Sequence, residues 1–278
     1  MARLASRLAV LPLVAFAVPA LAAPPDPIAL VNKADVLKDG LAGVSITAVH
    51  EVTDTAGKTD KQVYRVLNQV SSGASFIVIS SESPDVNGMV YVIKGGVLFA
   101  AAPNQRSFVR LGSLNLDRRV SGSLFSHWDL QGNIPLGTEY TPAIATSDAT
   151  KAQVELTAKP GSHYKKITGE VDLKTGLFLD MAFSDDKGVL KTVVYEKPRN
   201  MGTKTKKKLP TLITMKRGDG RSDLPVAKTT FKISEAEFDP AVDYGEELAV
   251  SDANLQRLRS RYVLSGDAFR SLLAEAGD

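Results

Sequence analysis

Two series of short alternating segments, each segment ended by a tight turn, constrain the fold of this chain more than any other feature. Gly95-Gly96 joins two of the segments, and glycine reaches the positive φ that two-residue hairpins need. No helical spacing lies between the segments, and parallel strands would need long crossovers. The pattern predicts a mainly β fold, an antiparallel meander that curls toward a half-open β-barrel. The expected strands are 44–52, 62–70, 75–80, 89–94, 97–101, 164–173, 177–184, 189–196, 208–217 and 226–234.

Three stretches do not fit the strand pattern. Residues 112–149 are too long for an ordinary loop, since loops beyond about 12 to 15 residues are usually functional or disordered, and we expect a lid there. Residues 28–41 have nearly helical spacing, and residues 243–278 form a tail in which we expect another helix. That second helix would be capped by Ser251, with an apolar side made of Leu255, Leu258 and Tyr262.

Alternation is most informative in the three adjacent strands between residues 164 and 196. Side chains two apart share a face, so these strands present one wide apolar surface. It is either an ordinary core covered by the helices or the lid, or the wall of a ligand cavity, and the ordinary core is the commoner case. The residues expected to line a cavity are Ile167, Val171, Leu177, Leu179, Met181, Phe183, Leu190 and Val194.

The first 22 residues have the three parts of an export signal. Arg3 and Arg7 give a positive start, residues 8–18 are apolar, and Ala20-Leu21-Ala22 supplies the small residues that precede cleavage. The apolar run is shorter than the roughly 20 residues of a membrane-spanning helix. We therefore expect cleavage before Ala23 and a soluble periplasmic protein, with one domain over residues 23–242 followed by the tail.

Composition narrows the possible partners. The chain contains no cysteine, which excludes disulfides and a lipid-modified cysteine anchor. Without Arg3 and Arg7 it holds 32 basic and 31 acidic residues, a balance that argues against nucleic acid, which needs a strong basic excess. We expect a monomer without a cofactor.

A set of motifs between residues 84 and 130 resembles a known family. Pro84-Asp-Val-Asn-Gly88 precedes a strand, Pro103 follows a hairpin, and Arg118-Arg119 leads into Gly122-Ser-Leu-Phe-Ser-His-Trp-Asp-Leu130. Later, Tyr164-Lys-Lys-Ile167 and Gly188-x-Leu-Lys191 precede strands. These features resemble the outer-membrane lipoprotein-sorting (LolA-like) proteins of the bacterial periplasm, over roughly residues 28–240. His127-Trp128 departs from the Tyr-Glu type of pair that is usual in that family.

The resemblance implies a half-open antiparallel barrel around a helix, an apolar cavity that receives acyl chains, and no catalytic residues. Its motif residues, which would belong to a lid, are Gly122, Ser123, Phe125, Ser126, Trp128, Asp129 and Leu130. From the residues alone the stretch is equally a packed plug, because Phe125 and Trp128 are large apolar groups that seek burial. Asp129 would then cap the local backbone.

The densest basic cluster is Lys204, Lys206, Lys207 and Lys208. We interpret it mainly as the solvated start of a strand that discourages edge-to-edge pairing. Contact with anionic lipid head groups or with an acidic partner is the alternative.

No motif indicates an enzyme. The three histidines, His50, His127 and His163, are far apart and lack zinc-site spacing. Ser126 and His127 are adjacent and point in different directions, and no Gly-x-Ser-x-Gly elbow occurs. We expect neither catalytic residues nor a metal site; a hydrolase would need convergent polar groups inside the cavity.

The function expected from these features is a periplasmic carrier or chaperone for lipoprotein acyl chains or another lipid, served by membrane-bound donor or acceptor proteins. The alternative is a protein-binding or lipid-sensing regulatory module on the same fold, suggested by the lysine cluster and the arginines of the tail.

Overall fold

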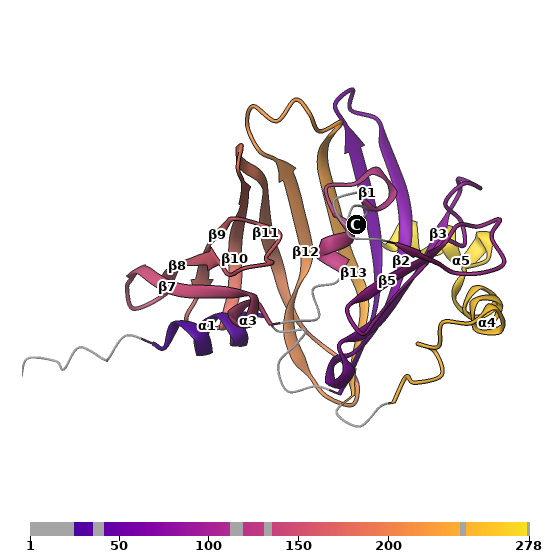
Figure 1. Ribbon diagram of the computed structural model, residues 1–278, viewed down its shortest axis with the longest axis horizontal. Helices are drawn as coiled ribbons and strands as arrows, with labels where there is room; N and C mark the ends of the chain where they lie inside the picture. The colour runs from indigo at the N-terminus through magenta and orange to yellow at the C-terminus, as the bar shows by residue number, and fades with distance from the viewer. Residues whose placement is uncertain (1–24, 36–41, 112–118, 131–134, 240–242, 277–278) are drawn as a thin grey trace, which may run out of the picture.

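A computed structural model describes residues 25–35, 42–111, 119–130, 135–239 and 243–276. Its described strands form one antiparallel sheet of thirteen strands, in the order β6-β5-β4-β3-β2-β1-β13-β12-β11-β10-β9-β8-β7, so β6 and β7 are its edges (Figure 1). The strands are β1 (Gly43–Asp54), β2 (Thr59–Gln69), β3 (Ala74–Ser81), β4 (Val90–Lys94), β5 (Val97–Ala101), β6 (Val109–Leu111), β7 (Tyr140–Ser147), β8 (Lys151–Ala158), β9 (Lys166–Asp172), β10 (Leu177–Asp185), β11 (Gly188–Met201), β12 (Lys207–Arg217) and β13 (Val226–Asp239).

Two meanders make up the sheet. Strands β1 to β6 and strands β7 to β13 each pair with their neighbours in sequence, and β1 joins the two series by pairing with β13 from Gly43↔Asp239 to Asp54↔Val226. The predicted mainly β, half-open antiparallel fold is confirmed. Gly95 and Gly96 have φ values of 57° and 71°, as the predicted hairpin requires.

Three strands are missing from the sequence prediction: β6, β7 and β8. Strand β7 lies inside residues 112–149, so the expectation that this stretch contains no strand is wrong at its end. Pro142 lies in β7, and an edge strand tolerates proline because one side of it needs no ladder hydrogen bonds.

Helix α1 (Pro27–Ala34) and the short helix α3 (Leu136–Glu139) lie beside β7 of the second meander. The short helix α2 (His127–Leu130) contacts both meanders, through Tyr91 of β4 and Lys191 of β11. The carboxylate of Asp26 caps α1 by accepting from the backbone N–H groups of Ile28 and Ala29. Leu30, Val31 and Ala34 are buried and belong to the hydrophobic cluster that also includes side chains of β8 to β11. The helix expected over 28–41 therefore exists up to Ala34, where Asp35 is its C-cap, and residues 36–41 fall outside the described residues.

The C-terminal tail contains two helices, α4 (Asp252–Tyr262) and α5 (Gly266–Glu275). Ser251 is the N-cap of α4, as predicted, and its side chain accepts from the N–H of Asn254. Leu255 and Leu258 pack with residues of β2 to β5, and Phe269 of α5 packs with residues of β1 and β2.

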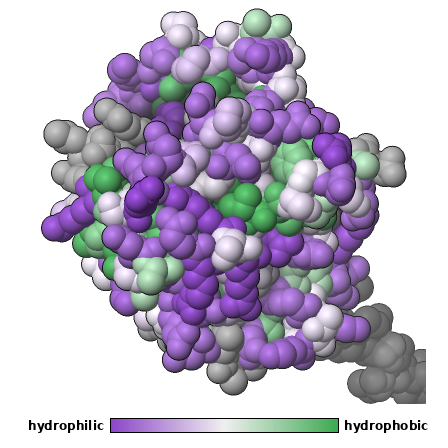
Figure 2. All heavy atoms as spheres, turned by 90° about the vertical axis from the view of Figure 1, so that its right-hand side faces the viewer, coloured by the Kyte–Doolittle hydropathy of each residue, from purple (hydrophilic) through white to green (hydrophobic). Residues whose placement is uncertain are grey.

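The tail therefore lies on the outer face of the first meander. It does not cover the apolar surface of β9 to β11, although its helix is one of the covers that the sequence predicts for that surface. Strand β3 explains the position, because all eight of its residues are buried and both of its faces need covering. Seen from this side, the surface is mostly hydrophilic, with hydrophobic residues in small groups (Figure 2).

The predicted export signal, residues 1–22, falls outside the described residues. None of the helices in the described ranges is long and apolar enough to cross a membrane.

Candidate functional site

A cavity of about 380 Å³ lies on the inner face of the curled sheet, between the two meanders. Strand β3 contributes Ile77 from one side and β10 contributes Met181 from the other, so strands far apart in the sheet face the same space. Helices α1 and α2 contribute Ala34 and Asp129 respectively, and α3 contributes Leu136 and Glu139. The lining is mostly apolar and aromatic. The volume of the cavity is in the range of small-molecule pockets, roughly 300–1,000 Å³.

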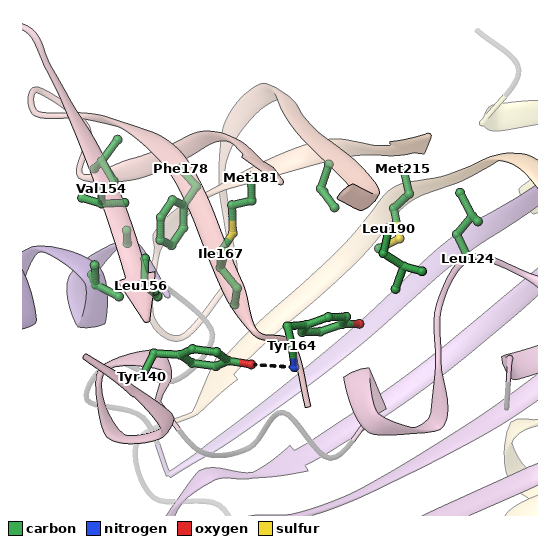
Figure 3. Packing of buried hydrophobic residues seen from close by; sticks show 14 of the residues in the cluster. Leu124, Tyr140, Val154, Leu156, Tyr164, Ile167, Phe178, Met181, Leu190 and Met215 are labelled. Carbon is green, nitrogen blue, oxygen red and sulfur yellow. Dashed lines mark hydrogen bonds between the residues drawn. The ribbon is translucent and has the colours of Figure 1, made fainter. Parts of the chain in front are cut away.

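The structure brings half of the predicted cavity residues to this space. Ile167, Leu177, Met181 and Phe183 line it. Val171 and Leu190 belong to the buried cluster behind the lining, part of which Figure 3 shows. That these residues bind a ligand stays a prediction.

Two predicted lining residues, Leu179 and Val194, are not part of the cavity wall. The pairing of β9 with β10 shifts between Phe178 and Asp180, so Phe178 lines the cavity in place of Leu179. The pairing of β10 with β11 shifts between Phe183 and Ser184, after which Lys191, Val193 and Tyr195 face inward. Val194 is 37% exposed. A bulge inserts one residue and reverses the alternation beyond it, and strict two-residue counting misses it.

A buried ion pair is the main polar feature of the wall, and sequence reasoning missed it. The Nζ of Lys191 lies 2.6 Å from Oδ2 of Asp129, and these side chains are 2% and 11% exposed. Lys191 also donates to the carbonyl oxygen of Leu124, and its Nζ lies 5.1 Å from the ring centre of Phe183. A lysine between apolar residues carries no sequence signal that separates it from a solvated one.

Asp129 accepts more hydrogen bonds than its predicted role as a cap of the local backbone requires. Its carboxylate accepts from the N–H and hydroxyl of Ser126, as a cap would, and also from the hydroxyl of Tyr164 at 2.5 Å. Burial alone would raise the pKa of Asp129, but the charge of Lys191 and these hydrogen bonds outweigh it and hold the pKa below its ordinary value. The carboxylate therefore stays ionised inside the wall.

This ion pair joins residues 122–130, which carry the motif of the resembled family, to β11 of the second meander. Gly122 ends a 3-10 helix (η3, Val120–Gly122) with φ 72°, and Ser123 is buried. The N–H of Leu124 donates to the hydroxyl of Thr229 at 3.0 Å. Phe125 lines the cavity and packs edge-on against Phe231 with ring centres 5.5 Å apart. The side chains of Trp128 and Leu130 fall outside the described part of the chain.

Two tyrosines form hydrogen bonds next to Asp129. The hydroxyl of Tyr140 accepts from the backbone N–H of Tyr164 at 3.3 Å, the hydrogen bond drawn in Figure 3. Burial, followed by the negative charge of Asp129, raises the pKa of Tyr164 well above its ordinary value. Tyr164 therefore acts as a neutral donor to Asp129.

His50 lies just beyond the cavity, on the inner face of β1. Its ring is fully buried between Tyr64 and Phe231, with ring centres 4.4 Å away in each case. Burial lowers the pKa of His50 to about 3, so the ring is neutral. This histidine packs as an aromatic residue.

No group of three or more potential metal ligands occurs among the residues that the structure describes. The cavity wall contains the Asp129–Lys191 pair, whose members neutralise each other, and two further acidic residues, Asp35 and Glu139. The absence of catalytic residues stays a prediction.

Comparison with known proteins identifies the fold. A family model described as "-like: Uncharacterized protein" matches residues 73–245, which is more than half of the chain. The chain belongs to this family. A LolA superfamily protein from Nitrosomonas europaea has a similar structure, with a TM-score of 0.66, 19% identity, and coverage of 83% of this chain and 100% of that one. The fold is LolA-like, which confirms what the sequence resemblance implied about the fold.

Two further structures are similar over nearly their whole length. A DUF1329 family protein from Desulfovibrio piger has a TM-score of 0.65 at 17% identity and covers 81% of this chain and 98% of its own. A putative outer membrane lipoprotein-sorting protein domain from Vibrio parahaemolyticus has a TM-score of 0.65 at 16% identity, with coverage of 83% and 98%. A search among curated proteins finds no match.

Proposed function

We propose that this protein binds the hydrophobic chains of a lipid or of an acylated lipoprotein in its inner cavity and shelters them from water in the periplasm. The observation that carries the proposal is the apolar cavity of about 380 Å³ between the two meanders. The export signal predicted over residues 1–22 and the LolA-like fold support it.

Burial of an acyl chain supplies enough free energy for this role. Each methylene removed from water contributes roughly 0.8 kcal/mol, so a chain of ~16 carbons contributes on the order of 10 kcal/mol before the costs of association and ordering. Carrier function needs no chemical step beyond reversible binding. We therefore propose that the cavity is a binding site and not an active site.

Native mass spectrometry of the protein purified from the periplasm of cells that export it, followed by lipid extraction, tests the proposal. We expect a defined acylated ligand at close to one copy per chain. A mass without ligand, and no uptake when lipid is titrated in, would contradict the carrier role and favour the protein-binding or lipid-sensing module.

A matched pair of variants assigns the binding to the cavity. Ile213 is half-buried and lines the cavity, whereas Val194, on the neighbouring strand, faces outward. Ile213→Trp should fill part of the cavity and abolish lipid uptake, while Val194→Trp should bind lipid like the wild type. Equal uptake by both variants would place the lipid elsewhere. Circular dichroism checks that both variants fold.

A further inference from the structure

Positive charge is concentrated at one hairpin of the sheet. Residues 197–208, here called the basic hairpin, comprise the end of β11, the turn and the start of β12. They contain no acidic residue and six basic ones: Lys197, Arg199, Lys204, Lys206, Lys207 and Lys208. The remainder of the chain after residue 22 holds 26 basic and 31 acidic residues. The hairpin therefore carries six positive charges, whereas the rest of the chain after residue 22 has a net charge of −5 (26 minus 31).

Most of this charge is exposed and uncompensated. Lys204 pairs with Asp239 at 2.5 Å. The side chains of Lys197, Arg199, Lys206 and Lys208 are exposed, and none of them forms an ion pair with another residue of the described ranges.

The lysines at the start of β12 lie where this strand is paired on one side. Strand β12 pairs with β11 from Lys207 onward, but with β13 only from Leu212 to Lys216. The interpretation as a strand start that discourages edge pairing therefore stays a prediction, and the same exposed charges remain available to a binding partner.

The basic hairpin is held in a fixed position. The N–H and hydroxyl of Thr203 both donate to the carboxylate of Glu237, and Met201 packs in a core cluster with Phe238. Gly202 has φ 96°, and a Cβ at this position would meet the carbonyl oxygen of Thr205 and the ring of Phe238. The charges therefore sit on a rigid tip, which lies at the lower end of the long strands in Figure 1.

This tip adjoins the cavity. Leu209 and Pro210 follow Lys208 directly and line the cavity, and Arg199 is the cross-strand partner of Leu209. One end of the apolar space therefore lies beside the positive charge.

We propose that the basic hairpin docks on the anionic head groups of a bilayer and so places this end of the cavity at the membrane surface. The choice of a bilayer rests on the proposed function, because acyl chains leave and enter the carrier at membranes. Five of the six charges are lysines, compact charges on flexible stems that suit a diffuse anionic surface better than the paired geometry of a carboxylate site.

Vesicle flotation with the chain from Ala23 onward tests the docking. We expect binding to phosphatidylcholine vesicles that contain phosphatidylglycerol, little binding to phosphatidylcholine alone, and release by salt, which screens exposed charges. A triple variant, Arg199→Gln, Lys206→Gln and Lys208→Gln, should bind about a hundredfold more weakly, at roughly fivefold for each charge removed. A control with the same loss of charge is Lys58→Gln, Lys216→Gln and Lys228→Gln, at exposed positions toward the other end of the long strands.

Each outcome of the flotation decides the matter. Equal loss in both triple variants would show an effect of net charge and overturn the assignment to the hairpin. If the wild-type protein does not bind anionic vesicles, the docking proposal is wrong. Retention of the protein on an immobilised polyglutamate would then favour an acidic protein partner.

The Ile213→Trp variant separates this proposal from the carrier function. If it floats with anionic vesicles like the wild type but takes up no lipid, docking and cavity binding are independent. If wild-type protein docks but retains no lipid, the carrier function fails and the docking stands.

Discussion

Replacing Lys191 by methionine would remove one member of the buried ion pair and leave the Asp129 carboxylate in the cavity wall without its countercharge. Methionine fits the space of the lysine stem, so packing changes little. The two side chains are 2% and 11% exposed, which places them in the buried class of ion pairs. Breaking such a pair from one side costs about 3–5 kcal/mol of unfolding free energy, a large part of the 5–15 kcal/mol typical of a domain.

Urea unfolding followed by circular dichroism at neutral pH measures this loss. The double variant Lys191→Met with Asp129→Asn removes both charges and keeps an oxygen for the hydroxyl of Tyr164, so it should be more stable than Lys191→Met alone. Because the folded pKa of Asp129 is lowered, the contribution of the pair should persist above about pH 4 and disappear as the pH falls through that lowered value.

An exposed pair provides the control. The Nζ of Lys151 lies 2.6 Å from Glu170, the same distance as in the buried pair, but the lysine side chain is 50% exposed. Lys151→Met should therefore change stability far less. If Lys191→Met costs no more than Lys151→Met, burial does not control the strength of the pair and the reasoning is refuted.

Three other substitutions test further parts of the fold. Burial lowers the pKa of His50 from 6.5 to about 3, so unfolding takes up a proton below about pH 6.5. The free energy of unfolding should therefore fall by up to a few kcal/mol between about pH 6.5 and about pH 3. His50→Phe should reduce this pH dependence in urea titrations at several pH values. Leu258→Ala, at a fully buried position of α4, should cost about 2–5 kcal/mol in the same assay, and an unchanged midpoint would show that the tail does not contribute to the core. Gly202→Ala should lower the melting temperature, because its Cβ meets the backbone of Thr205, whereas an unchanged value would mean that the turn relaxes freely.

The sequence predicted the fold class because turns and alternation are local signals. Gly95-Gly96 fixes one hairpin by itself, and strands such as β1 and β12 agree with their predicted ranges within a few residues. Strand β8 carries the same signal, with Ala152, Val154 and Leu156 buried, although it lies outside the predicted strands. Strand β7 has a weaker pattern that includes a proline.

The candidate site was harder to predict because it depends on interactions between distant residues. The two register shifts in β10 and β11 replace Leu179 and Val194 in the wall by Phe178 and Val193, and no local pattern marks a bulge. The partners Asp129 and Lys191 are 62 residues apart, so only the folded chain shows that they meet.

The pairing of β1 with β13 also sets the order in which the molecule can assemble. Each meander can form from hairpins between neighbours in sequence, but the sheet becomes continuous only when a strand near the end of the chain reaches the first one. Contacts between such distant segments form slowly. Until then the long edge of β1 offers unpaired backbone groups to any other extended chain, so the time between synthesis and this last pairing is when the protein is most exposed to aggregation.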